Sequence, residues 1–213
     1  MRLREFEVGP FLARCVVLAA DDGPDAIVVD PGFDAEVVLA AIREAGLQPR
    51  AIVLTHAHID HTYGVAEVKR AFPDASVLLH RDDLPLFHNL PMQARMFGFP
   101  MPADVPEDGL LADGDHVSVG SDRLLVRHCP GHSPGHIVLI EESSAPGLAI
   151  VGDVLFAGSI GRTDLWGGSF EQLERSIREV LYRLPADTRV IAGHGPETTI
   201  GEERANNPFV RPE

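Results

Sequence analysis

Short apolar runs separated by turn residues dominate the sequence and predict a chain of strands interrupted by a few helices. The residues between the runs are rich in Gly, Pro, Asp and Ser, which favour turns. Residues 142–147 are expected to connect two strands as a hairpin, and residues 208–213 to form an extended tail. The predicted strands cover residues 2–8, 12–18, 26–30, 51–54, 77–79, 116–119, 124–127, 137–141, 148–151 and 189–192.

Other segments show the helical spacing of apolar residues and predict helices at 34–45, 64–72, 82–87 and 169–184. Asp34 stands at the N-cap position of the first helix, and Ser169 with Gln172 forms a capping box at the start of the last. Helices alternating with strands in the first half imply a partly parallel sheet with helices outside it. The apolar face of the first helix is expected to consist of Val37, Val38, Ala41, Ile42 and Ala45.

Residues 89–107 break this pattern, because prolines interrupt a stretch that is nevertheless rich in Met and Phe. One interpretation is a loop packed on the core, or a short helix followed by a linker. The other is a flap that lines a substrate pocket, since long loops in compact domains are often lids.

The strongest chemical signal follows the apolar run at 51–54. The segment Thr55-His56-Ala57-His58-Ile59-Asp60-His61 places four metal-capable side chains within six residues. His56 and His58 point the same way in extended backbone, and Asp60 and His61 follow a short turn, where they could serve a second ion. Imidazole nitrogens combined with a carboxylate suit zinc, iron or manganese.

Three single residues share a position with this segment, because each closely follows an apolar, strand-like run. They are His132, Asp153 and His194. Open sheets usually build their sites from residues gathered at several strand ends. His136 also begins a strand, and we expect a structural or supporting role for it rather than metal ligation.

The segment 55–61 resembles the signature of the metallo-β-lactamase superfamily, and the resemblance extends over nearly the whole chain. It implies an α+β fold, an αββα four-layer sandwich of two mixed β-sheets with helices on both outer faces, in one domain spanning 1–213. It also implies a binuclear centre with Asp153 as the bridge. One metal would be held by His56, His58 and His132, and the other by Asp60, His61 and His194.

The resemblance also implies supporting residues. Asp30 and Thr55 would lie behind the ligands, with Asp30 orienting a ligand histidine. Spacing alone is equally compatible with a turn-forming Asp before Pro31. Arg162 and Asp164, in a Gly-Arg-Thr-Asp segment, could contact substrate or form a loop ion pair. Asp60 is better assigned as a ligand than as a free base, and the second role remains open.

Within the superfamily the sequence is most similar to short glyoxalase II-like enzymes, the hydroxyacylglutathione hydrolases. The matching segments are 55–61, 161–164 and 193–199. A metal-bound hydroxide would then attack the carbonyl of a thioester such as S-lactoylglutathione, with a thiolate as leaving group. Full-length glyoxalase II enzymes grip glutathione with a helical C-terminal domain. This chain ends 19 residues after His194, so glutathione as the carrier is an open question.

Alternatives with the same motif are a mono-iron persulfide dioxygenase acting on glutathione persulfide, and a lactonase or β-lactamase. In the dioxygenase, His56, His58 and an Asp or His of the motif would hold the iron. A non-enzymatic metal-binding module is the remaining alternative, and the intact set of seven ligands argues against it.

The expected partner is a small-molecule substrate, with a glutathione thioester as one candidate, and composition argues against two other kinds of partner. The formal net charge of −14 argues against nucleic acid, and no apolar run is long enough to span a bilayer. Charged residues occupy the place of a signal peptide's apolar core, which predicts a cytoplasmic protein. Cys15 and Cys129 are expected to be buried, reduced thiols. The oligomeric state cannot be predicted from the sequence.

Overall fold

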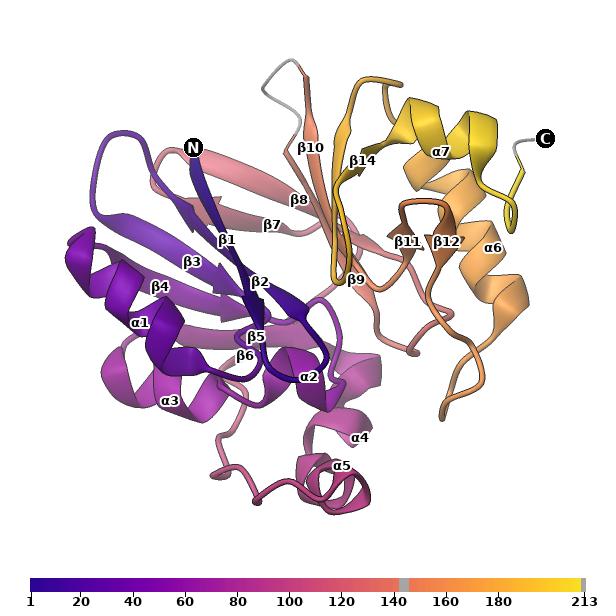
Figure 1. Cartoon of the computed structure of the whole chain (residues 1–213). Coiled ribbons are helices and arrows are strands. Elements are labelled where there is room, and N and C mark those ends of the chain that lie inside the picture. The colour runs from indigo at the N-terminus through magenta and orange to yellow at the C-terminus, as the bar shows by residue number, and fades with distance from the viewer. Residues whose placement is uncertain (142–145, 212–213) are drawn as a thin grey trace. The chain divides into compact units, whose positions relative to one another are not determined.

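The computed structural model describes residues 1–141 and 146–211 (Figure 1). The chain divides into two compact units. The N-terminal unit comprises residues 1–111 and 118–123, and the C-terminal unit comprises 112–117 and 124–213. Most of the connection predicted at 142–147, and the end of the predicted tail, lie outside the described residues.

A six-stranded mixed sheet forms the centre of the N-terminal unit, in the order β1-β2-β3-β4-β5-β6. The first three strands pair antiparallel, and β3 to β6 pair parallel. Parallel neighbours bring the carboxyl ends of β3, β4 and β5 to one edge of the sheet. The strands are β1 (Arg2–Val8), β2 (Ala13–Ala19), β3 (Asp25–Val29), β4 (Gln48–Val53), β5 (Ser76–His80) and β6 (Gly109–Leu111).

Helices α1 and α3 lie on one face of this sheet (Figure 1). Their buried residues Val38, Ile42 and Val68 belong to one core cluster with Ile52 and Val77 of the strands. The helices of this unit are α1 (Ala35–Glu44), α2 (Ile59–Thr62), α3 (Val65–Ala71), the 3-10 turn η1 (Arg81–Asp83), α4 (Leu84–Phe87) and α5 (Leu90–Phe97).

Two predictions for the first helix are wrong. Asp34 occupies the N-cap position, but its backbone is left-handed (φ 54°) and its side chain makes no capping hydrogen bond. Its carboxylate instead accepts from the backbone N–H of Gly9, at 2.9 Å. Val37 is 57% exposed, because Val38, Leu39 and Ile42 turn the buried face away from it.

The irregular segment contains a short helix, α5, followed by residues 98–108 without regular structure. The interpretation as a short helix and a linker is therefore confirmed. The interpretation as a substrate flap stays a prediction. Within the described part of the chain, the longest helices have ten residues, and no helix is suited in length and apolar character to cross a bilayer.

The C-terminal unit contributes most of a second six-stranded mixed sheet, in the order β14-β13-β10-β9-β8-β7. Strands β10 and β13 pair parallel, whereas β10 pairs antiparallel with β9. A two-stranded hairpin, β11–β12, follows β10. The strands are β7 (His116–Val119), β8 (Asp122–His128), β9 (Ile137–Glu141), β10 (Leu148–Gly152), β11 (Leu155–Phe156), β12 (Ser159–Ile160), β13 (Arg189–Ala192) and β14 (Thr198–Thr199).

Helix α6 (Phe170–Glu179) and helix α7 (Ile200–Asn206) share a core cluster with β9, β10 and β13. The helix predicted to reach residue 184 ends at Glu179 and continues as the 3-10 turn η2 (Leu181–Arg183). At its start, the Ser169 hydroxyl accepts from Gln172 N as predicted. The Ser169 N–H donates to Gly131 O, at 2.8 Å, and so is not bonded by the Gln172 side chain. Helix α7 was not among the helices predicted from the sequence.

We predict that Gly131→Ala destabilises the fold by about 2 kcal/mol, because a Cβ at residue 131 would lie 2.2 Å from the backbone nitrogen of Leu173. Gly131 also has a φ of 134°, which side-chain-bearing residues rarely adopt. Gly23→Ala is the matched control, since nothing lies within 4 Å of its Cβ position. Urea denaturation measures both. An unchanged midpoint for Gly131→Ala would show that α6 does not approach Gly131 this closely.

Candidate metal centre

The N-terminal unit gathers its predicted ligands directly after β4. His56 and His61 are fully buried, and His58 is 9% exposed. The ring of His56 lies 4.8 Å from that of His58 and 4.3 Å from that of His61, measured between centroids. Helix α2 carries Asp60, whose Oδ2 lies 3.7 Å from His61 Nε2. The motif therefore folds back on itself and places its imidazoles side by side.

The carboxylate of Asp30, at the end of β3, fixes two of these rings. Its Oδ1 accepts from Thr55 N at 2.7 Å, and its Oδ2 accepts from the Thr55 hydroxyl at 2.6 Å and from His61 Nδ1 at 3.0 Å. The Thr55 oxygen in turn lies 3.0 Å from His56 Nδ1. Because a hydroxyl that donates to Asp30 can accept from His56, and because a carboxylate accepts from His61, we assign the proton of both rings to Nδ1. Each Nε2 then presents the lone pair that a metal ligand needs.

Asp30 reaches this position through an unusual backbone. Its φ of 51° lies in the left-handed region, which turns the chain sharply at the end of β3. Gly32 then passes so close to α2 that a Cβ would lie 2.0 Å from Asp60 O. Asp30, His56 and His61 offer ligand atoms within 4.8 Å of one another. The oxygens of Asp30 already accept three hydrogen bonds, so we assign Asp30 to positioning rather than to coordination.

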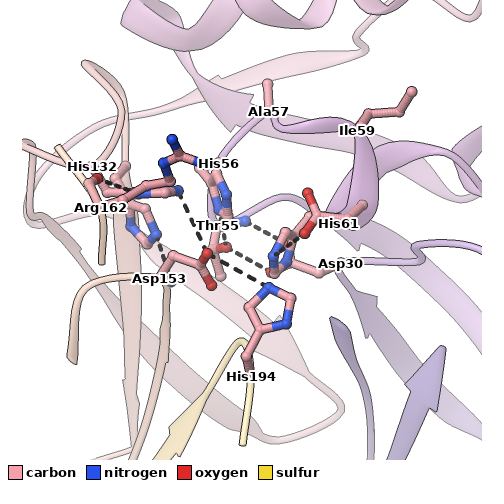
Figure 2. A network of polar contacts seen from close by, with 12 residues as sticks. Asp30, Thr55, His56, Ala57, Ile59, His61, His132, Asp153, Arg162 and His194 are labelled. Atoms are coloured by element: carbon pink, nitrogen blue, oxygen red, sulfur yellow. Dashed lines mark hydrogen bonds and ion pairs between the residues drawn. The ribbon is translucent and has the colours of Figure 1, made fainter. Parts of the chain in front are cut away.

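The C-terminal unit gathers the other predicted ligands around Asp153, which directly follows β10. Its Oδ2 lies 3.5 Å from His132 Nε2 and 3.6 Å from His194 Nε2 (Figure 2). These separations exceed an ordinary hydrogen bond of about 2.7–3.2 Å. They match two ligand atoms that each lie about 2.1 Å from one ion, which are about 3.4 Å apart at a tetrahedral angle. His132 Nδ1 donates to Arg162 O at 2.8 Å, which leaves the lone pair on Nε2.

Neighbouring residues brace Asp153. The Asp153 N–H donates to His136 Nε2 at 3.0 Å, so buried His136 supports the backbone of a predicted ligand. Gly161 also passes close, because a Cβ there would lie 1.9 Å from Asp153 O and 3.2 Å from His132 Nδ1. The turn that carries Asp153 is therefore closely packed.

A second brace comes from Glu203 on α7, which is 2% exposed. Its carboxylate accepts from the Thr198 hydroxyl at 2.7 Å, from Gly158 N at 3.0 Å and from Asn207 Nδ2 at 2.8 Å. Thr198 belongs to the segment after His194, and Gly158 belongs to the β11–β12 hairpin after Asp153. Glu203 thus connects the two segments that follow these predicted ligands, a role that was not evident from the sequence.

A sequence signal for this brace exists at the start of α7. Thr199 and Glu202 have the spacing of a helix N-terminus, and Thr199 Oγ1 accepts from Glu202 N at 3.2 Å. The spacing of Thr199 and Glu202 is therefore a sequence pattern from which the start of α7 can be predicted. The carboxylate network of Glu203 has no comparable signal, because it depends on which loops lie opposite the helix.

Arg162 and Asp164 pair with each other through two hydrogen bonds, of 2.7 and 2.8 Å. The Arg162 guanidinium lowers the pKa of Asp164 to about 2, and both side chains are exposed. The structure therefore contains the loop ion pair of the sequence analysis, and substrate contact by these residues stays a prediction. Burial raises the pKa of the Cys15 and Cys129 thiols, which keeps both protonated and unsuited to metal ligation.

Each unit by itself thus brings together part of the predicted ligand set, with a donor chemistry that fits divalent metal ions. Five of the seven predicted ligands are buried, whereas Asp60 and His194 are partly exposed. Hydrogen bonds at Nδ1 orient His56, His61 and His132, and Asp153 lies at inter-ligand distances from His132 and His194. The N-terminal unit holds His56, His58, Asp60 and His61, and the C-terminal unit holds His132, Asp153 and His194.

The comparisons with known proteins agree with this chemistry. Residues 8–194 match the model of the metallo-beta-lactamase superfamily. The chain is 38% identical over 211 residues to a protein of Haemophilus influenzae named hydroxyacylglutathione hydrolase GloC, covering 99% of this chain and 98% of that protein.

Two solved structures are similar over nearly their whole length. The B3 metallo-beta-lactamase BLEG-1 superposes with a TM-score of 0.89 at 38% identity, covering 98% of this chain and 99% of that chain. TTHA1623, solved in a di-iron-bound form, superposes with a TM-score of 0.86 at 39% identity, covering 97% and 100%. The predicted α+β class with two mixed sheets and helices is confirmed. The chain therefore belongs to the metallo-β-lactamase superfamily of metal-dependent hydrolases.

Proposed function

We propose that this hydrolase cleaves a thioester, with S-lactoylglutathione as the candidate substrate, and that two divalent ions serve the reaction. The ligands would be the seven residues predicted from the sequence, with Asp153 as the bridge between the ions. The likeness to GloC over 99% of the chain supports the thioester class. The small-molecule partner and the cytoplasmic location remain predictions of the sequence.

One observation carries the proposal of a metal centre. The Nε2 atoms of His132 and His194 both lie about a ligand-to-ligand distance from the same oxygen of Asp153, at 3.5 and 3.6 Å. If both Nε2 atoms are unprotonated, their lone pairs face the negatively charged oxygen of Asp153. Without a cation between them, these groups would repel one another. A cation bound between them would replace this repulsion by coordination.

The donor set suits zinc, iron or manganese, because all three accept mixed nitrogen and oxygen ligands. The similarity to TTHA1623, described in a di-iron-bound form, supports iron as one candidate. The identity of the metal is therefore part of the proposal that metal analysis has to decide.

When bound, the ions would polarise the carbonyl of the substrate and lower the pKa of water. The protein's own contribution is to hold protons and charges in place. Asp30 keeps the His61 proton on Nδ1 and, through the hydroxyl of Thr55, the His56 proton on Nδ1. The backbone carbonyl of Arg162 does the same for His132.

Thioester cleavage needs little help from a general acid. A thiolate leaves without prior protonation more readily than an alkoxide, because the pKa of a free thiol is about 8.5. This property agrees with a site whose carboxylates we assign to coordination and positioning, Asp60 included. Asp60 as a base stays an open alternative.

We predict that removing bound metal with a chelator lowers the rate of S-lactoylglutathione hydrolysis at least about 100-fold, because a metal ion contributes several kcal/mol to stabilising the transition state. Adding back zinc, iron or manganese should restore the rate. Loss of the thioester absorbance measures the reaction. One control is dialysis after the chelator treatment, so that direct inhibition by the chelator is excluded. The other is a circular dichroism spectrum, which shows whether the stripped protein is still folded.

An unchanged rate in the stripped protein would contradict metal-dependent hydrolysis. Oxygen consumption with glutathione persulfide, without thioester cleavage by the metal-loaded protein, would instead identify a persulfide dioxygenase. A lactone and a β-lactam in the same panel test the other hydrolytic alternatives.

We predict that Asp30→Asn weakens metal binding about 10–100-fold, the usual cost of losing a hydrogen-bond partner behind a ligand. The amide would present N–H groups where His61 Nδ1 now donates, and so disfavour the proton position that leaves a lone pair on Nε2. Asp74→Asn, at an exposed position, is the matched control. Competition with a chromogenic chelator measures both affinities, and equal affinities would remove Asp30 from the proposed role.

A further inference from the structure

In the ligand segment, residues 55–61, polar side chains from three separate places in the chain hold the backbone at alternate residues. The N–H groups of Thr55, Ala57 and Ile59 donate to carboxylate or amide oxygens. The acceptors are Asp30 Oδ1 at 2.7 Å, Asp83 Oδ2 at 2.9 Å and Gln93 Oε1 at 3.0 Å. After the end of β4, these backbone N–H groups therefore donate to side-chain oxygens, whereas within a sheet they would donate to the carbonyl groups of a neighbouring strand.

Asp83 is fully buried and follows β5, the neighbour of β4. It occupies the N-cap position of α4, yet its side chain makes no capping hydrogen bond there. One carboxylate oxygen is used instead on Ala57 N, between the two histidines His56 and His58. A buried carboxylate is costly to desolvate, so its hydrogen bonds constrain the segment strongly.

Gln93 lies on α5 and uses all the hydrogen-bonding capacity of its nitrogen. Its Nε2 donates to Ala57 O and to Leu86 O, both at 3.0 Å, while its Oε1 accepts from Ile59 N. The amide therefore spans His58, bonded to the residue before it and the residue after it. The same nitrogen ties the segment to α4.

The contact with Ile59 matters because Ile59 begins α2, the four-residue helix that carries Asp60 and His61. A helix this short is not stable by itself, and its first N–H groups have no partner within the helix. The residue at its N-cap is His58, whose side chain makes no capping hydrogen bond. Gln93 supplies the acceptor from another helix.

We propose that Gln93, together with Asp83, is a positioning residue for the metal ligands His58, Asp60 and His61. This inference rests on the metal centre of the proposed function, and not on the identity of the substrate. It also gives α5 a role, because the irregular segment in which α5 lies supports the ligand segment through one amide side chain.

The test is metal affinity of Gln93→Met, which keeps the length of the side chain and removes its hydrogen bonds. Zinc affinity, measured by chelator competition, should fall about 10–100-fold. Gln172→Met is the matched control, because Gln172 is an exposed glutamine on α6 of the other unit, and its zinc affinity should stay within about threefold of the parent. Thermal unfolding of the metal-free proteins separates a loss of affinity from a loss of folding.

A zinc affinity of Gln93→Met within threefold of the parent, in a folded protein, would overturn the proposal. Amide hydrogen exchange of the parent protein tests it even if that variant does not fold. The Ile59 amide should exchange more slowly than in an unstructured peptide, with or without metal. Exchange at the unstructured rate would show that Gln93 does not hold the segment. Neither readout depends on the substrate, so failure of the thioester assay leaves both tests valid.

Discussion

The buried carboxylate of Asp30 is the interaction on which the N-terminal part of the proposed metal centre depends. A buried charge costs several kcal/mol unless it is hydrogen-bonded, and Asp30 accepts from Thr55 twice and from His61 once. These bonds explain why a left-handed backbone is tolerated at this residue. They also favour a proton on Nδ1 of His56 and His61. The residue that directly follows β3 therefore determines which nitrogen of each ring is available to a metal ion.

In both units, hydrogen bonds from neighbouring residues position the predicted ligands, but the groups that make these bonds differ. In the N-terminal unit, side chains from neighbouring elements fix the segment after β4. In the C-terminal unit, the carbonyl of Arg162, the ring of His136 and the carboxylate of Glu203 brace the turns that carry His132, Asp153 and His194. In both units the predicted ligands follow strands that are paired within a sheet. Because the sheet already restricts the backbone there, little further conformational entropy is lost when the ligands are ordered.

Much of this could be predicted from the sequence, because strands and ligand motifs are local patterns. Strands such as β9 and β13 were predicted with their observed bounds, and the ligand segment was evident from its histidine spacing. Contacts between distant residues were not predictable. Gln93 lies 34 residues from Ile59, and Glu203 lies 45 from Gly158. The outward orientation of Val37 likewise depends on how the whole helix packs, not on its own apolar character.

The number of metal ions bound per chain tests the central claim most directly. The protein would be stripped with chelator, dialysed against excess zinc or iron, freed of unbound ions, and analysed by inductively coupled plasma mass spectrometry. Two ions per chain are the predicted result. X-ray absorption spectroscopy should show nitrogen and oxygen ligands around them, as expected for His and Asp side chains. A folded chain that retains no ion under these conditions would contradict the account.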